Sequence, residues 1–109
     1  YNILFCGITF KENCPDVRNT KVIEIVNYFI KLNFNIDIFD PEADPEQLKK
    51  INNFKLNSRK EINKKKYDAI VFAVSHDKFK KYGISYFKKL CNKKYFLFDI
   101  KNLFNIKGF

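Results

Sequence analysis

The sequence predicts an α/β domain with about five mostly parallel strands and helices on both faces of the sheet. Three observations support this prediction. Apolar, strand-like runs alternate along the chain with segments of helical periodicity. The first run, residues 3–8, is almost continuously apolar, which is typical of a strand buried on both faces. The stretches between strands leave room for the helical crossovers that parallel strands require. Such an arrangement is Rossmann-like, with three layers.

The expected elements follow one another in a regular order. Five segments have the pattern of strands, namely residues 3–8, 34–39, 54–56, 69–74 and 95–100. Five others are expected to be helical, namely residues 17–32, 45–51, 58–66, 77–82 and 85–91. In the first of these, apolar side chains recur at steps of three and four residues, at Val22, Ile25, Val26, Phe29 and Ile30. Pro45 suits the first turn of the second helix, and Ser58 is an expected N-cap of the third.

Composition limits the class of protein. A chain of 109 residues makes one domain, and 46% hydrophobic residues are too many for a disordered chain. No apolar run approaches the roughly 18 residues of a membrane span. The sequence begins with Tyr1 rather than Met and shows no signal segment, so we expect a fragment of a longer protein. Three cysteines without a CxxC spacing argue against disulfides and structural zinc, and favour the cytoplasm.

The net charge of +9 leaves two interpretations open. A basic chain suits a polyanionic partner, so the alternative function is a nucleic-acid-binding α/β domain. However, only Arg18 and Arg59 among the 21 basic residues are arginines, whereas nucleic-acid binders usually rely on Arg. Lys, Asn, Ile and Phe are all abundant, as an AT-rich coding sequence would produce. Compositional drift is therefore the favoured explanation of the charge, and a polyanionic partner is the alternative.

Functional residues are sought where the parallel strands end, because ligands collect at that edge of such sheets. The loop after the first strand contains one glycine, Gly7, so it is neither a GxGxxG loop nor a P-loop. It does place Lys11 and Arg18 in or beside a loop that leads into a helix N-terminus, which favours an anion such as phosphate. The simpler interpretation is that both are solvated cations paired with Glu12 and Asp16.

The remaining reactive side chains suggest no catalytic or metal site within the chain. Cys6 and Cys91 fall at apolar positions and are expected in the core, and Cys14 is expected to serve loop structure. His76 is the only histidine, so it cannot build a metal site alone. We expect it at the start of a helix that Asp77 caps.

Four segments carry a family resemblance. Residues 7–22, G-I-T-F-K-E-N-C-P-D-V-R-N-T-K-V, resemble the opening of the C-terminal, UDP-binding domain of the UDP-glucose/GDP-mannose dehydrogenase family. The similarity is strongest to the branch that oxidises UDP-N-acetylhexosamines. Residues 39–41 (F-D-P), 67–77 (Y-D-A-I-V-F-A-V-S-H-D) and 98–103 (F-D-I-K-N-L) resemble later family motifs in the same order. The resemblance therefore covers nearly the whole chain.

The resemblance implies roles for four residues. Phe10, Lys11 and Lys101 occupy the positions that contact the UDP-sugar, and Arg18 occupies the one that reaches NAD bound on the partner domain. The family oxidises a UDP-hexose or UDP-N-acetylhexosamine to a uronic acid for surface polysaccharides, with NAD as the hydride acceptor. Its nucleophilic Cys and GxGxxG loop lie in the preceding domains, and the enzymes are homo-oligomers. Residues 1–109 are thus expected to be one UDP-binding domain that is inactive alone.

A signalling domain of the response-regulator type has the same five-stranded α/β plan. It would need a cluster of acids at the strand ends. The loops of this chain present Lys11 and Lys101 there instead.

Overall fold

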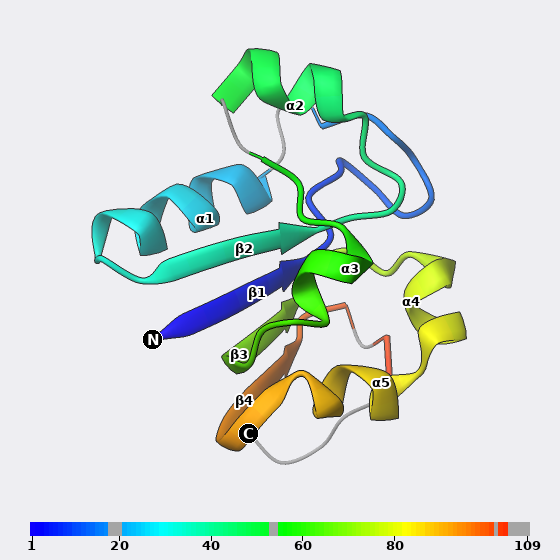
Figure 1. Cartoon of the computed structure of the whole chain (residues 1–109). Helices are drawn as coiled ribbons and strands as arrows, with labels where there is room; N and C mark the ends of the chain where they lie inside the picture. The colour runs from blue at the N-terminus through cyan, green and yellow to red at the C-terminus, as the bar shows by residue number, and fades with distance from the viewer. Residues whose placement is uncertain (18–20, 53–54, 102, 105–109) are drawn as a thin grey trace.

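A single parallel sheet organises the computed structural model, which describes residues 1–17, 21–52, 55–101 and 103–104 (Figure 1). Its strands are β1 (Asn2–Cys6), β2 (Asn35–Phe39), β3 (Tyr67–Phe72) and β4 (Cys91–Asp99), in the order β2-β1-β3-β4. All three strand pairs are parallel. The carboxyl ends of the strands therefore meet at one edge of the sheet, where the arrowheads of Figure 1 point.

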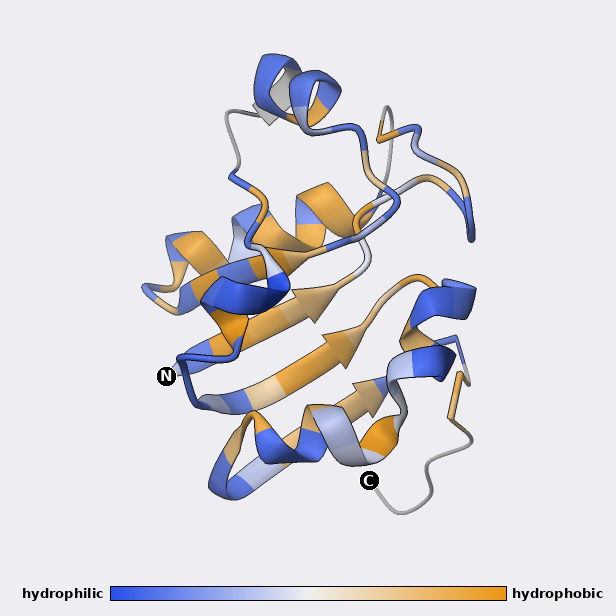
Figure 2. Cartoon of the chain, turned by 45° about the vertical axis from the view of Figure 1, so that its right-hand side comes forward, coloured by the Kyte–Doolittle hydropathy of each residue, from blue (hydrophilic) through white to orange (hydrophobic). Residues whose placement is uncertain are grey.

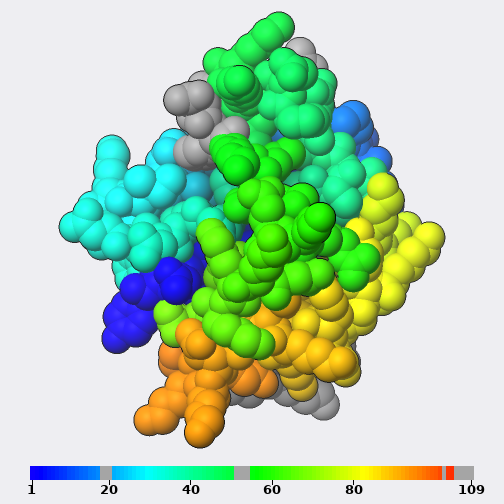
Figure 3. Space-filling view, in the orientation of Figure 1, coloured from blue at the N-terminus to red at the C-terminus, as the bar shows by residue number. Residues whose placement is uncertain are grey.

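Helices cover both faces of this sheet. They are α1 (Lys21–Lys31), α2 (Pro45–Asn52), α3 (Arg59–Ile62), α4 (Asp77–Tyr82) and α5 (Ile84–Lys89). One core cluster joins α1 and α2 to the sheet, through buried residues such as Val26 and Leu48. The other joins α3, α4 and α5 to the opposite face, through residues such as Phe79 and Phe87. Figure 3 shows this second layer from outside, with the green atoms of α3 beside the yellow atoms of α4 and α5. The three-layer prediction is confirmed.

The position of β1 inside the sheet explains why its sequence is almost continuously apolar. Its successive side chains point to opposite faces, so Ile3 and Phe5 enter one core cluster while Leu4 and Cys6 enter the other. All four are buried. Figure 2 shows the same concentration of hydrophobic residues in the strands.

The described sheet has four strands, one fewer than the prediction of about five. Of the predicted edge strand at residues 54–56, Phe54 lies outside the described residues, and Lys55 and Leu56 are in no strand. The chain nevertheless touches the edge of β2 just afterwards. The Asn57 amide donates to the Ile38 carbonyl (2.7 Å), and the Asn57 side-chain oxygen accepts from the Ile38 amide (3.1 Å). A side chain thus replaces part of a strand ladder.

The capping prediction for Ser58 is confirmed, although the helix is shorter than expected. Ser58 accepts from the Glu61 amide (3.1 Å), and Glu61 accepts from the Ser58 amide (2.9 Å), which together form a capping box. The helix ends at Ile62 rather than at residue 66. Ile62 is buried, whereas the three lysines that follow are exposed, so nothing packs them as a further helical turn.

None of the described helices has the length and apolarity that a bilayer crossing requires.

Candidate functional site

A pocket lies at the carboxyl edge of the sheet, where the sequence places the candidate site. It has a volume of about 380 Å³, and its lining comes from the loop after β1, the start of α1, the loop after β3 and the turn after β4. The lining residues are Thr9, Phe10, Lys11, Glu12, Lys21, Val22, Ala73, Val74, Ser75 and Lys101. The structure thus brings Phe10, Lys11 and Lys101 together, although Lys101 lies 90 positions after Lys11 in the sequence. Arg18 lies outside the described residues.

Gly7 allows the strand ends beneath this pocket to approach each other. Its φ is +97°, and a Cβ there would lie 2.7 Å from the Cβ and 2.8 Å from the amide nitrogen of Val74. Only glycine tolerates both the backbone conformation and the contact. The single glycine of this loop is therefore used for packing β1 against the chain that leaves β3.

The lysines of the pocket point to an anionic ligand. Lys11, Lys21 and Lys101 line it together with one acid, Glu12. Among the described residues, neither Lys11 nor Lys101 takes part in an ion pair, so the predicted pairing of Lys11 with Glu12 is absent. Lys21 was not singled out from the sequence. It opens α1, where the helix dipole adds to its positive charge.

Hydrogen bonds hold the backbone that carries the exposed residues of the pocket. Asp99 fixes the turn that carries Lys101, because its carboxylate accepts from the amides of Leu103 (2.6 Å) and Phe104 (2.7 Å). The Phe10 amide donates to the Asp16 carbonyl (2.7 Å) and so closes the loop that carries Lys11. The Phe10 ring itself is 62% exposed, which leaves an aromatic face available at the rim.

A buried polar cluster underlies this loop, and the sequence interpretation missed it. Thr9, Asp40 and His76 are all buried. The His76 Nε2 lies 3.0 Å from the Asp40 Oδ2 and 3.2 Å from the Thr9 Oγ1. His76 does precede α4, at the N-cap position, but its ring makes no capping bond there. Asp40 and His76 each follow an apolar strand-like run, but that pattern does not show that the two side chains meet.

Asp40 ties this cluster to the backbone. Its Oδ2 also accepts from the Ile8 amide (2.7 Å), and its Oδ1 accepts from the amides of Glu42 (2.8 Å) and Ala43 (3.0 Å). Asp40 thus fixes the turn that follows β2. In addition, the carboxylate links the end of β2 to the end of β1.

The cysteines form no site among the described residues. All three are free thiols, and no group of three or more potential metal ligands occurs in that part of the chain. Burial, and then the negative charge of Asp40, raise the pKa of the Cys6 thiol well above its usual range. Cys6 is therefore a protonated core residue, as expected, and Cys14 is partly buried in the loop.

The described residues do not form a site for the NAD pyrophosphate. Such a site needs several glycines so that the backbone can approach the phosphates. Here the loop after β1 has only one glycine, Gly7. Val74 occupies the space beside it where a side chain would lie.

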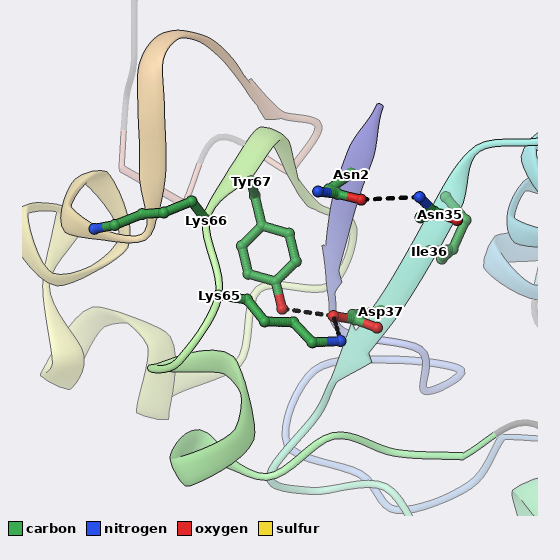
Figure 4. Close-up of a pocket in the computed structure, with 7 residues that line it drawn as sticks. All are labelled: Asn2, Asn35, Ile36, Asp37, Lys65, Lys66 and Tyr67. Atoms are coloured by element: carbon green, nitrogen blue, oxygen red, sulfur yellow. Dashed lines mark hydrogen bonds and ion pairs between the residues drawn. The ribbon is translucent and has the colours of Figure 1, made fainter.

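A second pocket, of about 520 Å³, lies at the opposite, amino edge of the sheet (Figure 4). Its polar groups are already paired with one another. Asp37 accepts from the Tyr67 hydroxyl (2.7 Å) and from the Lys65 ammonium (2.8 Å). The side-chain NH₂ group of Asn35 donates to the side-chain oxygen of Asn2 (3.1 Å). Burial and the neighbouring Asp37 raise the pKa of Tyr67, so its hydroxyl remains a donor. This pocket is a cluster of paired polar groups at the amino ends of β1, β2 and β3.

Comparison with known families decides the assignment. The model of the UDP binding domain of the UDP-glucose/GDP-mannose dehydrogenase family matches residues 4–106. The chain belongs to this family.

Similar proteins agree with the family match. The chain is 38% identical over 100 residues to UDP-N-acetyl-D-glucosamine 6-dehydrogenase of Salmonella typhi, covering 92% of the chain and 23% of that protein. It is 40% identical over 101 residues to Protein CapL of Staphylococcus aureus, covering 91% and 23% respectively. The chain therefore spans about a quarter of the length of these relatives.

A solved structure shows the same fold. The UDP-N-acetyl-mannosamine dehydrogenase Cap5O from S. aureus superposes with a TM-score of 0.70 at 19% identity, over 97% of this chain and 23% of that one. The α/β fold class is thus confirmed independently of the sequence motifs.

Proposed function

We propose that this chain is the UDP-binding domain of an NAD-dependent UDP-N-acetylhexosamine 6-dehydrogenase, with residues 1–109 forming one domain of a longer enzyme. One observation carries the proposal. Phe10, Lys11 and Lys101, to which the family resemblance assigns the UDP-sugar, line one pocket at the carboxyl edge of the sheet.

The geometry suits a nucleoside diphosphate. Lys11 and Lys101 reach the pocket from the ends of β1 and β4, which flank β3 on opposite sides. They bracket an anionic ligand between two point charges. The exposed Phe10 ring offers an apolar surface for the uracil or the sugar.

The substrate class follows from the relatives. Two of them are named for UDP-N-acetyl-D-glucosamine and one for UDP-N-acetyl-D-mannosamine. We therefore assign a UDP-N-acetylhexosamine as the substrate and its uronic acid, a surface-polysaccharide precursor, as the product. The enzyme would be a cytoplasmic homo-oligomer in which the N-terminal and central domains complete the site.

In this proposal, the described residues do not bind NAD. NAD accepts the hydride in the intact enzyme, held mainly by the N-terminal domain, and the family resemblance assigns Arg18 to it. The role of this chain is to bind and orient the UDP part of the substrate. The isolated 109 residues should accordingly form no NADH from NAD and a UDP-sugar, and measurable NADH formation would contradict the assignment.

Calorimetry with UDP, GDP and a short RNA, at about 50 and 200 mM salt, tests the proposal. We expect UDP to bind more tightly than GDP, and Lys101→Glu to weaken UDP binding while Lys65→Glu, at the amino edge, leaves it unchanged. Absence of UDP binding together with strongly salt-dependent RNA binding would instead support a nucleic-acid-binding domain.

A further inference from the structure

The loop that carries Phe10 and Lys11 is anchored on both sides to a single imidazole. On one side the Thr9 hydroxyl lies 3.2 Å from the His76 Nε2. On the other, the Asn13 amide donates to the His76 Nδ1 (2.9 Å). Phe10, Lys11 and Glu12 span the two anchors and are exposed at the pocket. His76 itself is completely buried.

The hydrogen-bond directions define the state of the ring. A backbone amide can only donate, so the Nδ1 of His76 carries no proton and the neutral ring bears its proton on Nε2. The Nε2 proton faces the Asp40 carboxylate (3.0 Å). The Thr9 hydroxyl donates to the Lys11 carbonyl (2.9 Å), so its oxygen is free to accept from the ring. Asp40 thereby selects the tautomer that can hold the loop.

A second set of contacts fixes the far end of the loop to α4. The Asn13 side-chain oxygen accepts from the Asp77 amide (3.0 Å), and its NH₂ group donates to the Asp77 carboxylate (3.2 Å). Asn13 has a φ of +58°, in the left-handed region that asparagine tolerates better than most residues. The loop is thus held in a backbone conformation that its side-chain contacts support.

We infer that His76 is a positioning residue: in its Nε2-protonated form it fixes the loop of residues 9–13 so that Lys11 and Phe10 face the pocket before the ligand arrives. The inference rests on the proposed function for the identity of the ligand, a nucleoside diphosphate. Preorganisation of this kind raises affinity because the loop loses little freedom on binding.

Two substitutions of His76 distinguish the roles of its two ring nitrogens. The side-chain oxygen of Asn is as many bonds from Cβ as Nδ1 is, and the NH₂ nitrogen of Gln is as many as Nε2 is. His76→Asn therefore keeps an acceptor for the Asn13 amide, whereas His76→Gln keeps only the donor to Asp40. We expect slow hydrogen exchange at the Asn13 amide in the wild type and in His76→Asn, and about fivefold faster exchange or more in His76→Gln. Equal exchange in all three proteins would overturn the inference.

A second variant avoids disturbing the core. Asn13→Gly keeps the positive φ but removes both contacts with Asp77. Asn33→Gly is the matched control, because Asn33 is exposed, has a φ of +67° and lies in the turn after α1. We expect Asn13→Gly to weaken UDP binding about fivefold and Asn33→Gly to leave it unchanged.

A double-mutant cycle distinguishes positioning from general destabilisation. If the anchors act through Lys11, the effect of Asn13→Gly on the UDP Kd should largely vanish in a Lys11→Ala background and persist in a Lys101→Ala background. Equal effects in both backgrounds would overturn the inference. If wild-type chain binds no UDP, the proposed function fails, and the exchange rates at Asn13 still decide whether His76 holds the loop.

Discussion

The two edges of the sheet use polar residues in opposite ways. At the amino edge, Asp37 is bonded to both Tyr67 and Lys65, so the polar groups of the larger pocket satisfy one another (Figure 4). At the carboxyl edge, Lys11 and Lys101 make no ion pair among the described residues and face the smaller pocket. Pocket size alone would select the amino edge, where the polar groups are already paired with one another. The state of pairing, rather than volume, indicates where a ligand can be recognised.

Burial shows the same contrast. Beneath the carboxyl edge, Thr9, Asp40 and His76 are buried and hydrogen-bonded, and they support an exposed loop. At the amino edge, the Lys65–Asp37 pair is itself partly exposed, and Asp37 also accepts from the Tyr67 hydroxyl. The carboxyl edge thus has a supporting layer and a surface layer, which is the organisation expected of a binding site.

Gly7→Ala should have the largest effect, because it disturbs the floor of the carboxyl edge. The new Cβ would meet Val74 at 2.7 Å in a backbone conformation that alanine avoids. We expect the free energy of unfolding to fall by about 3 kcal/mol, measured by urea denaturation. Gly83→Ala is the control, since Gly83 also has a positive φ but no atom within 4 Å of its Cβ position. Equal losses for both variants would show that the close approach is unimportant.

Charge reversal on each edge should separate binding from stability. Lys11→Glu should raise the UDP Kd by about 10- to 100-fold, because it removes a charge-assisted contact and adds repulsion. Lys65→Glu places a like charge near Asp37 and should lower stability slightly, by less than about 1 kcal/mol for an exposed pair, with the UDP Kd unchanged. Isothermal calorimetry checks both. A weaker UDP affinity for Lys65→Glu than for Lys11→Glu would reverse the comparison.

Tyr67→Phe tests whether the amino edge is structural. The ring is buried and its hydroxyl donates to Asp37 at 2.7 Å. Its removal should cost about 1 kcal/mol of unfolding free energy and leave UDP binding intact. Thermal and urea denaturation measure the first quantity and calorimetry the second. A loss of UDP binding without a loss of stability would mean that the amino edge contributes to the site.

Thiol titration should give the smallest effect. Burial raises the pKa of Cys91, at the amino edge, to about 11. An unfolded thiol ionises near about pH 8.5. The contribution of the protonated Cys91 thiol to the free energy of unfolding is therefore complete below about pH 8.5 and is lost as the pH rises to about 11. The rate of Cys91 alkylation in the folded chain should therefore keep rising toward about pH 11, as mass spectrometry of its peptide can follow. A midpoint near pH 8.5 in the folded chain would contradict the assigned burial.

Much of the fold could be predicted from local patterns. The apolar run of β1 predicts a buried strand, and Ser58 followed by Glu61 predicts a capping box. Both predictions succeed because each pattern is contained in residues close together in the sequence. The predicted strand at residues 54–56 has no such local determinant. Asn57, the residue after it, bonds to Ile38 instead, with its amide as the donor and its side-chain oxygen as the acceptor. Sequence periodicity does not encode that exchange.

The candidate site was predictable only in part. The sequence motifs placed Phe10, Lys11 and Lys101 at strand ends, and the parallel sheet then brings those ends together. The support from His76 was missed, because it depends on contacts with Thr9 and Asn13, which are more than 60 residues away in the sequence. A helix-start histidine and a buried loop anchor look the same in a single sequence.

The most direct test of the account is a UDP titration of the ¹⁵N-labelled chain, followed by amide chemical shifts at low and moderate salt. The account predicts that the largest shift changes cluster at Phe10, Lys11 and Lys101, and that they disappear in Lys11→Glu. Shift changes centred instead on Asp37, Lys65 and Tyr67, or no response to UDP in the folded wild-type chain, would contradict the claim that the carboxyl edge is the UDP-binding site.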